Sequence, residues 1–514
     1  MARGQNKWLI AAAVAIGALM EIIDSSIVNV ALTDMQASLG ATLSQVSWVV
    51  SAYSIANVII LPLSAWLGMR FGKKNYFVFS LVGFTLSSIL CGTSTSLVML
   101  VIARILQGLT GGGLLAKAQS ILFETFSKEE QGTAQGLFGA IVIAGPTIGP
   151  TLGGYLVTNI GWRWIFFVNV PVGIAAVFLT MFALPRDEAR TEAHAPVDWT
   201  AIALLALGIG ALQTFLEQGN DDDWFQSSFI VALAVVAVIG LVAFVVRSLR
   251  SKHPVVDLRV LRYRSLWSGS LLSVVVGMAL YGALFAIPIF ASTQLHYTSQ
   301  QVGLLLLPGA LTSALVMPIS AKLAQKLDPR VMLVIGAAIL TTALAMFVNL
   351  SPQTSGSDLF WPLIVRAIGT VLMFLPLQLA AMGPIPKKDI SNATGLFNLT
   401  RQLGGSVGVA LLTTLLSRRQ AFHRSVIVEK LTSNGNGAIE RVNMYAQSMM
   451  AKGSAIDDAK HTAHAMLDGI VNQQAAIMSF GDTFWATAVL IVVTLPLVFL
   501  LGKPQAGAKV EMGH

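Results

Sequence analysis

Apolar residues run along this chain in long blocks, without the regular polar interruptions of a surface helix or strand. A helix needs about 20 apolar residues to cross the hydrocarbon of a bilayer. The pattern therefore predicts an all-α polytopic membrane protein with 14 transmembrane helices. The predicted spans are 8–32, 46–68, 76–97, 99–122, 133–157, 164–184, 198–216, 228–247, 266–292, 301–324, 331–350, 359–382, 393–417 and 480–501.

The positive charges between these blocks predict the orientation of the chain. With the N-terminus in the cytoplasm, the inner segments hold 21 Lys and Arg, whereas the short outer loops hold only Arg163. Short cytoplasmic loops are enriched in Lys and Arg in membrane proteins. We therefore expect both termini in the cytoplasm, which requires an even number of spans.

The second part of the chain repeats the first. Residues 62–74 and 318–330 share Pro, Ser, Ala and Leu at an offset of 256, and 134–149 and 393–408 share Gly-Leu-Phe at an offset of 259. Arg104 and Arg366 stand at a similar spacing. A repeat of six helices is shorter than these offsets, so an insertion must separate the two repeats. The two predicted spans within 198–247 are that insertion. The chain is therefore predicted to have six helices, then two inserted helices, then six more, which is the plan of the major facilitator fold with an insertion. The alternative is that the similarity between these glycine-rich helices arose by chance.

This plan divides the chain into segments and leaves one substantial part outside the membrane. We expect an N-terminal six-helix bundle at 1–185, two inserted helices with a cytoplasmic linker at 186–260, a C-terminal bundle at 261–502 and a cytoplasmic tail at 503–514. The outer segment 418–479 is predicted to form a helical hairpin with its turn at 433–437. Its returning arm carries an apolar stripe that either packs the two arms together or docks a partner: Ile456, Ala459, Ala463, Met466, Leu467, Ile470, Val471 and Ile477.

Composition excludes several classes of protein. Hydrophobic residues make up 55% of the chain and charged residues 11%, against about 25% charged in soluble proteins. The net charge of +8 is scattered over short loops, which argues against nucleic-acid binding. Cys91 is the single cysteine, the seven histidines lie between the blocks or at the end, and no phosphate-binding P-loop is present. We expect no metal, no cofactor and no ATP hydrolysis, so transport would draw on an ion gradient or on the gradient of the substrate.

Two acidic residues lie in the first span. Placing Asp24 or Glu21 inside a membrane costs roughly 2.5–3.5 kcal/mol, so such residues face a cavity or a partner. Asp24 either carries a proton or is permanently paired with a base, for which Arg104 is the candidate. The second half has no counterpart, because Leu280 to Leu284 occupy the corresponding positions, 256–260 residues later. Its intramembrane cations are Arg366 and Arg401.

Two further motifs have a physical interpretation. The segment 145–154 places three glycines at every fourth position, which permits close helix packing or forms a pivot for the two halves. The basic turn at 70–74 is either a topology anchor or a latch that pairs with neighbouring helix ends. The first motif consists of Gly145, Pro146, Gly149, Pro150, Gly153 and Gly154, and the second of Arg70, Gly72, Lys73 and Lys74.

Four segments resemble the 14-helix drug:proton antiporters of the major facilitator superfamily. They are the DSSIVNVAL run from Asp24, the RILQG run from Arg104, the repeated Gly-Pro motif, and WRWIFFVNVPVG from Trp162. The outer segment, ending in QQAA from Gln473, is similar to the EmrB type. In one departure, Ala65 and Met69 replace a glycine and an acid of the family's cytoplasmic-turn motif, which does not favour a charge-relay latch there.

The resemblance implies a function and partners. It makes Asp24 the proton site, Arg104 a coupling residue and the Gly-Pro motif a mark of export. It also implies a bacterial inner-membrane pump, embedded in lipid, that works with a periplasmic EmrA-like adaptor and a TolC-like outer-membrane channel.

We therefore expect a proton-driven exporter of small hydrophobic or amphipathic drugs. A strongly anionic substrate would predict more intramembrane Lys and Arg than the sequence has. A proton-coupled importer, a single-component exporter of one specific metabolite, a membrane-embedded enzyme and a scaffold are the alternatives. The expected substrate cavity between the halves is lined by amide, aromatic and basic side chains: Asn29, Trp48, Tyr53, Gln107, Tyr281, Phe285, Asn398, Arg401 and Gln402.

Overall fold

The computed structural model describes residues 6–185, 197–433, 436–453 and 455–501, and within these ranges all regular structure is helical. Thirteen of the described helical segments are long and apolar enough to cross a membrane, judged by length and composition. The predicted span 393–417 is not among them, although it lies within the long helix α16 (Ile390–Ser433). Its polar residues, including Asn398 and Arg401, lower the hydropathy of that helix. The all-helical fold is confirmed, whereas the count of fourteen spans and the cytoplasmic termini stay predictions.

The predicted N-terminal bundle contains six long helical segments, three of which are divided, the first of them by η1 between α1 and α2. The predicted span 99–122 is divided into α5 and α6 at Gly112 and Gly113, and a short turn, α8, precedes the last helix. Capping side chains define where several helices begin. The side chain of Asn6 accepts a hydrogen bond from the backbone N–H of Trp8 at the start of α1, and Thr42 forms a capping box with Gln45 at the start of α3. The helices are α1 (Lys7–Ile27), η1 (Val28–Ala31), α2 (Leu32–Leu39), α3 (Leu43–Phe71), α4 (Lys73–Gly92), α5 (Leu97–Gly111), α6 (Leu114–Thr125), α7 (Lys128–Asn159), α8 (Trp164–Phe167) and α9 (Asn169–Ala183).

The two inserted helices, α10 (Trp199–Gln218) and α11 (Ser228–Arg250), pack against each other through glycines. A Cβ atom at Gly208 would lie 2.8 Å from the backbone nitrogen of Leu241, so only glycine permits this approach. The other face of α10 packs on both α3 and α16. The inserted pair therefore covers the place where α3 of the first half meets α16 of the second.

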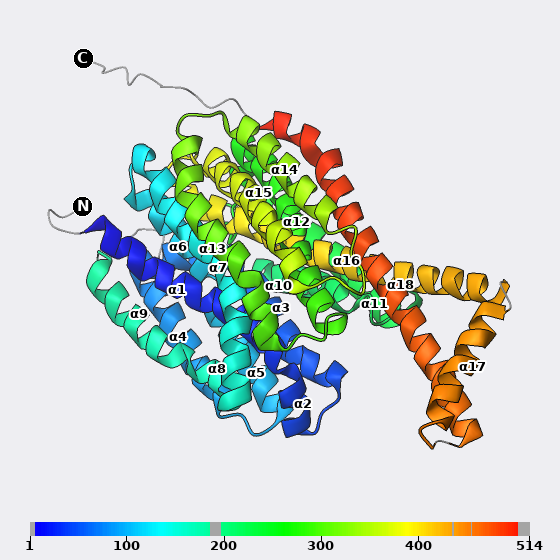
Figure 1. Ribbon diagram of the computed structural model, residues 1–514. Helices are drawn as coiled ribbons and strands as arrows, with labels where there is room; N and C mark the ends of the chain where they lie inside the picture. Colours follow the sequence, from blue (N-terminus) through cyan, green and yellow to red (C-terminus); the bar gives the residue numbers. More distant parts are fainter. Residues whose placement is uncertain (1–5, 186–196, 434–435, 454, 502–514) are drawn as a thin grey trace, which may run out of the picture.

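The remaining helices belong to the predicted C-terminal bundle, the second half, in which α14 packs on α15 and α12 on α16. The two halves meet along two lines of contact, α7 on α13 and α15, and α16 on α3 and α6. Figure 1 shows α7 beside α13 in the middle of the molecule. The elements are η3 (Trp224–Gln226), η4 (Leu258–Arg262), α12 (Arg264–Thr293), α13 (Ser299–Ala324), α14 (Pro329–Met346), α15 (Gly356–Met382), α16, α17 (Asn436–Met450), α18 (Ile456–Thr494) and η5 (Leu495–Leu500).

The outer segment differs from the predicted two-armed hairpin. Helix α16 does continue out of the bundle, but a third helical piece, α17, stands between it and the returning α18, and projects away from the bundle in Figure 1. Part of the predicted turn, residues 434–435, lies outside the described residues, as do residues 186–196 of the predicted linker and the predicted tail. The extra helix arises because residues 436–450 have helical spacing of Val442 and Ala446.

The apolar stripe of the outer segment has more than one environment. Ala459 and Ala463 are fully buried against α17, where Leu467 also packs. Val471 and Ile477 are buried nearer the membrane part of α18. Packing within the outer segment therefore accounts for Ala459, Ala463 and Leu467. The other members remain exposed, and they are Ile456, Met466 and Ile470.

Candidate functional site

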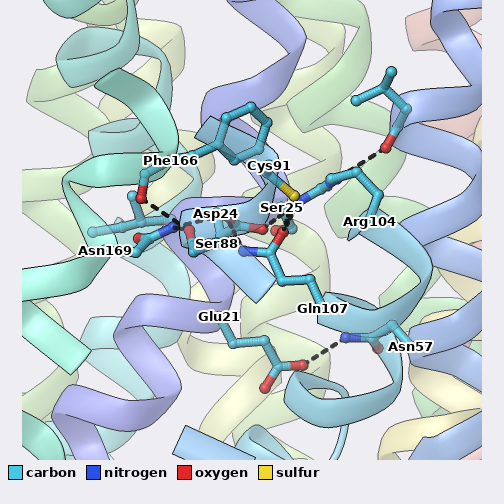
Figure 2. Close-up of polar contacts among 12 residues, drawn as sticks. Glu21, Asp24, Ser25, Asn57, Ser88, Cys91, Arg104, Gln107, Phe166 and Asn169 are labelled. Carbon is cyan, nitrogen blue, oxygen red and sulfur yellow. Dashed lines mark hydrogen bonds and ion pairs between the residues drawn. The ribbon is translucent and has the colours of Figure 1, made fainter. Parts of the chain in front are cut away.

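A buried ion pair lies at the centre of the first half. Asp24 of α1 and Arg104 of α5 are both fully buried, and Nη1 of Arg104 donates to Oδ2 of Asp24 at 2.6 Å. Oδ1 of Asp24 accepts from the side-chain amides of Gln107 at 3.0 Å and of Asn169 at 2.8 Å. Figure 2 shows the side chains of Arg104 and Gln107 from α5 and of Asn169 from α9 converging on Asp24. Three donors therefore hold a carboxylate that has no access to solvent in this structure.

The guanidinium of Arg104 is held from several directions. Its Nε donates to the carbonyl oxygen of Val49 at 2.9 Å, and its Nη1 also donates to Oε1 of Gln107 at 2.8 Å. The ring of Tyr53 lies beneath it, with 4.0 Å between the guanidinium carbon and the ring centroid. A buried charge pair needs such additional partners to offset the loss of hydration.

Behind Asp24 a chain of hydrogen bonds reaches α4 and α8. Asn169 donates to Oγ of Ser88 at 3.1 Å, and Ser88 donates to the carbonyl oxygen of Phe166 at 2.9 Å. The thiol of Cys91 contacts Oε1 of Gln107 at 3.5 Å. Asn169 and Ser88 are not among the site residues predicted from the sequence. The available signal was an amide side chain, Asn169, at the start of an apolar block.

Glu21 belongs to a separate network that reaches the second half. Its Oε1 accepts from Nδ2 of Asn57 at 2.8 Å, and its Oε2 accepts from the backbone N–H of Leu115 at 2.8 Å. Oδ1 of Asn57 in turn accepts from Nε2 of Gln402 at 3.2 Å. Within the described ranges no hydrogen bond joins the carboxyl groups of Glu21 and Asp24, and in Figure 2 Glu21 points toward Asn57. The two acids, three residues apart on α1, thus contact different helices.

The other predicted cavity residues divide into two groups. On α16, Asn398 and Arg401 are buried and hydrogen-bonded to each other, and Asn398 also donates to Gln119 of α6. With Gln402, they form part of the contact between the halves. Asn29 is exposed in η1, Trp48 and Phe285 are half-buried, and none of these three hydrogen-bonds to the networks of Asp24 or Glu21 in the described structure; the side chain of Tyr281 lies outside the described residues.

A third carboxyl group, which the sequence analysis did not single out, lies in the inserted pair. Oε1 of Glu217 in α10 accepts from Nε2 of Gln213 at 2.7 Å, and the same nitrogen lies 2.9 Å from Oγ of Ser406 on α16. Glu217 directly follows the predicted span 198–216, so the apolar pattern does not mark it as an intramembrane acid. In the described ranges no cluster of three or more His, Cys, Asp or Glu could hold a metal ion.

The Gly-Pro motif lies on α7, and its glycines face α1. Cβ atoms at these positions would meet Ile22 (from Gly145), Ser26 and Ile27 (from Gly149), and Val30 (from Gly153). Gly154 is also buried, and Pro146 and Pro150 lie inside the helix. These glycines therefore allow close packing of two helices of the first half, α1 and α7. They do not lie at a pivot between the two halves. A different face of α7, with Gly136 and Gly139, contacts α13.

The basic turn joins α3 to α4 and pairs with the ends of two other helices. Gly72 has a φ of +90°, a conformation that favours glycine. Lys73 forms an ion pair with Glu124 near the end of α6, and Lys74 donates to the carbonyl oxygens of Met181 and Leu184 at the end of α9. Arg70 lies over the ring of Trp66. The basic turn thus pairs with neighbouring helix ends, as the latch alternative predicted. It does so although Ala65 and Met69 stand where the family motif has a glycine and an acid.

Comparison with known proteins identifies the class of protein that this fold and site define. Residues 14–409 match the family described as the Major Facilitator Superfamily. The human organic anion transporter MFSD10 (TETRAN) has the same fold, with a TM-score of 0.55, 13% identity, and coverage of 95% of this chain and 99% of that one.

Several relatives match over nearly their whole length. The chain is 32% identical to the multidrug export protein EmrB of Escherichia coli K12, over 96% of this chain and 95% of the relative. It is 31% identical to the fatty acid resistance protein FarB of Neisseria gonorrhoeae, over 94% of both chains. The chain therefore belongs to the Major Facilitator Superfamily and, within it, to the EmrB-type transporters.

Proposed function

We propose that the protein is a proton-driven exporter of hydrophobic and amphipathic compounds, with Asp24 as its proton site. The observation that carries this proposal is the buried contact of Asp24 with Arg104, Gln107 and Asn169. A proton on Asp24 would cancel its charge and weaken all three contacts, because a neutral carboxylic acid is a poorer acceptor for a guanidinium. Since the partners lie on α5 and α9, protonation would change how α1 is held.

The relatives support export rather than import. Relatives at 32% and 31% identity are named for multidrug export and for resistance to fatty acids. A further relative, at 29% identity over 97% of both chains, is the colistin resistance protein EmrB of Acinetobacter baumannii. A proton-coupled importer or an exporter of one specific metabolite would use the same fold, so the direction and breadth of transport need measurement.

The first experiment measures substrate-triggered proton movement in proteoliposomes with an imposed pH gradient and an internal pH dye. Wild type, Asp24→Asn and the matched control Asp34→Asn would receive a panel of hydrophobic drugs. Asp34 lies exposed in α2, so its substitution makes the same chemical change away from the buried site. We expect the proton signal to disappear only in Asp24→Asn. Equal signals in all three proteins would remove Asp24 from the mechanism and shift attention to Glu21 and Glu217.

Direction is measured separately in intact cells. If the protein is a multidrug exporter, cells that express it will contain less of several unrelated drugs than control cells. Cells that express Asp24→Asn should contain as much of each drug as the control cells. Accumulation would favour the importer, and depletion of one compound alone would favour the specific exporter.

We further propose that the protein lies in a bacterial inner membrane and passes its substrates to an EmrA-like adaptor and a TolC-like channel. Support comes from the projecting α17–α18 segment, whose exposed apolar side chains offer a docking surface. These side chains are Ile439 and Met444 on α17, and Ile456, Met466 and Ile470 on α18.

Cross-linking to the adaptor tests this docking surface. Deleting residues 436–467 removes α17 and the part of α18 that packs on it, while leaving the buried side chains of Val471 and Ile477 in place. We expect the deletion, and Ile456→Ser with Met466→Ser, to abolish cross-linking. Glu440→Ser, an exposed change on α17 that keeps the apolar surface, serves as the control. Unchanged cross-linking after the deletion would eliminate this surface as the docking site.

A further inference from the structure

Arg366 is a buried cation outside the networks described above. It lies in α15 and is only 6% exposed. Among the described residues no hydrogen bond or ion pair reaches its side chain, and its Nε is a buried donor without a partner. Burial of an unpaired charge is unfavourable, and an anion beside the guanidinium would offset that cost.

The guanidinium faces a small cavity where the two halves meet. The cavity has room for about one water molecule and is lined by Thr147 of α7, Leu280 of α12 and Ser313 of α13, together with Arg366 and Thr370 of α15. Hydroxyl groups therefore accompany the cation, while Ile143 and Ala310 add apolar surface.

A glycine keeps the guanidinium accessible from this cavity. A Cβ atom at Gly309 of α13 would lie 3.8 Å from Nη2 of Arg366, in van der Waals contact with it. A longer side chain at this position would extend into the cavity beside the guanidinium.

The internal repeat explains why Arg366 lacks an acid. Arg366 follows Arg104 by 262 residues, and Leu280 follows Asp24 by 256. In the first half the arginine and the acid form an ion pair. In the second half the arginine remains, and Leu280 lines its cavity in place of an acid. Asp24 balances the charge of Arg104, and no acid takes that place beside Arg366 in the described structure.

We infer that Arg366 binds the carboxylate of an amphipathic substrate in the contact between the two halves. The inference rests on the proposed transport function and names a class of substrate for it, acids with a large apolar part. A guanidinium binds a carboxylate through two parallel hydrogen bonds, and the hydroxyl group of Thr370, which also lines the cavity, supplies a further donor. Entry of the substrate requires α7 to separate from α13, as rocking of the halves would allow. One cation serves one acidic group, so the sparse intramembrane charge of the sequence fits such a substrate.

Equilibrium binding to purified protein in lipid nanodiscs tests the inference. The probes are radiolabelled dodecanoate, an amphipathic carboxylate, and tetraphenylphosphonium, a hydrophobic cation. We expect Arg366→Gln to weaken dodecanoate binding by about ten- to a hundredfold, the loss of a charged hydrogen bond, and to change tetraphenylphosphonium binding less than about twofold. Lys326→Gln, the same loss of charge at an exposed site beyond α13, should change neither.

A second variant guards against misfolding of Arg366→Gln. Leu280→Asp would give Arg366 an internal partner, as Asp24 does for Arg104, and should also suppress dodecanoate binding. The inference is overturned if either variant weakens both probes equally, if neither affects dodecanoate, or if excess chloride displaces dodecanoate from wild type, which would assign Arg366 to a small inorganic anion.

The same proteins separate this inference from the proposed function. Tetraphenylphosphonium-triggered proton movement in Arg366→Gln, with unchanged dodecanoate binding, would overturn the inference and leave the antiporter intact. Dodecanoate binding that depends on Arg366, without any proton movement in wild type, would instead overturn the antiporter.

Discussion

At the scale of single residues, the site depends on amides that orient a buried charge pair. The side chain of Gln107 donates to Asp24 and accepts from Arg104, so it can satisfy both charges in one orientation. The sequence predicted Asp24 and Arg104 as possible partners, because ionisable residues in apolar blocks are rare enough to be conspicuous. It did not predict Asn169, since polarity along a span does not tell which neighbouring helix a side chain will face.

Asn169→Ala tests whether the amide holds Asp24 in place. The change removes the donor to Asp24 and leaves Ser88 without its contact to Asn169, which should destabilise the protein by about 1–3 kcal/mol. Thermal unfolding in detergent measures this as a lower melting temperature, and transport should decline with it. Asn159→Ala is the matched control, because Asn159 is exposed and donates only to the carbonyl oxygen of Tyr155 in its own helix. Equal melting temperatures for Asn169→Ala and wild type would contradict this role.

At the scale of helices, α7 links the site to the other half through two different faces. One face lies against α1 at Ser26 and Ile27, two and three residues after Asp24, and the other lies against α13. Glycine spacing predicted a close helix contact, and the structure has one. The spacing could not tell whether the partner belongs to the same half, because a stripe of small residues permits approach by any helix.

Gly149→Ala should separate α1 from α7. The added Cβ atom would overlap Oγ of Ser26 and lie 3.0 Å from the backbone nitrogen of Ile27, a position that costs roughly 1–3 kcal/mol through overpacking. We expect a lower melting temperature and reduced transport, both partly restored by adding Ser26→Gly. Gly469→Ala is the control, since a Cβ there meets no atom within 4 Å. A fully active, fully stable Gly149→Ala protein would show that the close contact is dispensable.

At the scale of the whole molecule, the internal repeat predicts two halves separated by an insertion, and this division of the chain stays a prediction. The span 393–417 shows where hydropathy is insufficient. Asn398 and Gln402 make α16 polar, and they donate to Gln119 and Asn57 across the contact between the halves. Polar residues that meet inside a bundle reduce the apolar signal on which span prediction depends.

Cross-links at the two ends of the α7–α13 contact test whether the halves must separate during transport. In a Cys91→Ser background, one pair replaces Gly136 and Ala321, and the other replaces Thr151 and Gly303. A Cβ atom at Gly136 would lie 3.1 Å from that of Ala321, and one at Gly303 would lie 2.8 Å from that of Thr151. Disulfides have Cβ separations of about 3.5–4.5 Å, so small shifts suffice.

We expect either disulfide to stop transport and a reducing agent to restore it. Each single-cysteine protein serves as the control for its pair. Transport that continues in a fully cross-linked protein would show that this end of the contact stays closed throughout the cycle.

The position of the inserted helices has a consequence for compounds dissolved in the bilayer. Of the two lines along which the halves meet, α10 covers the one formed by α3 and α16, and Gln213 and Trp224 fasten the inserted pair to Ser406 and Thr414 of α16. Lipid cannot reach the interior there without displacing α10 first. We therefore expect a lipophilic molecule that enters sideways from the membrane to pass between α7 and α13, on one side of the bundle only.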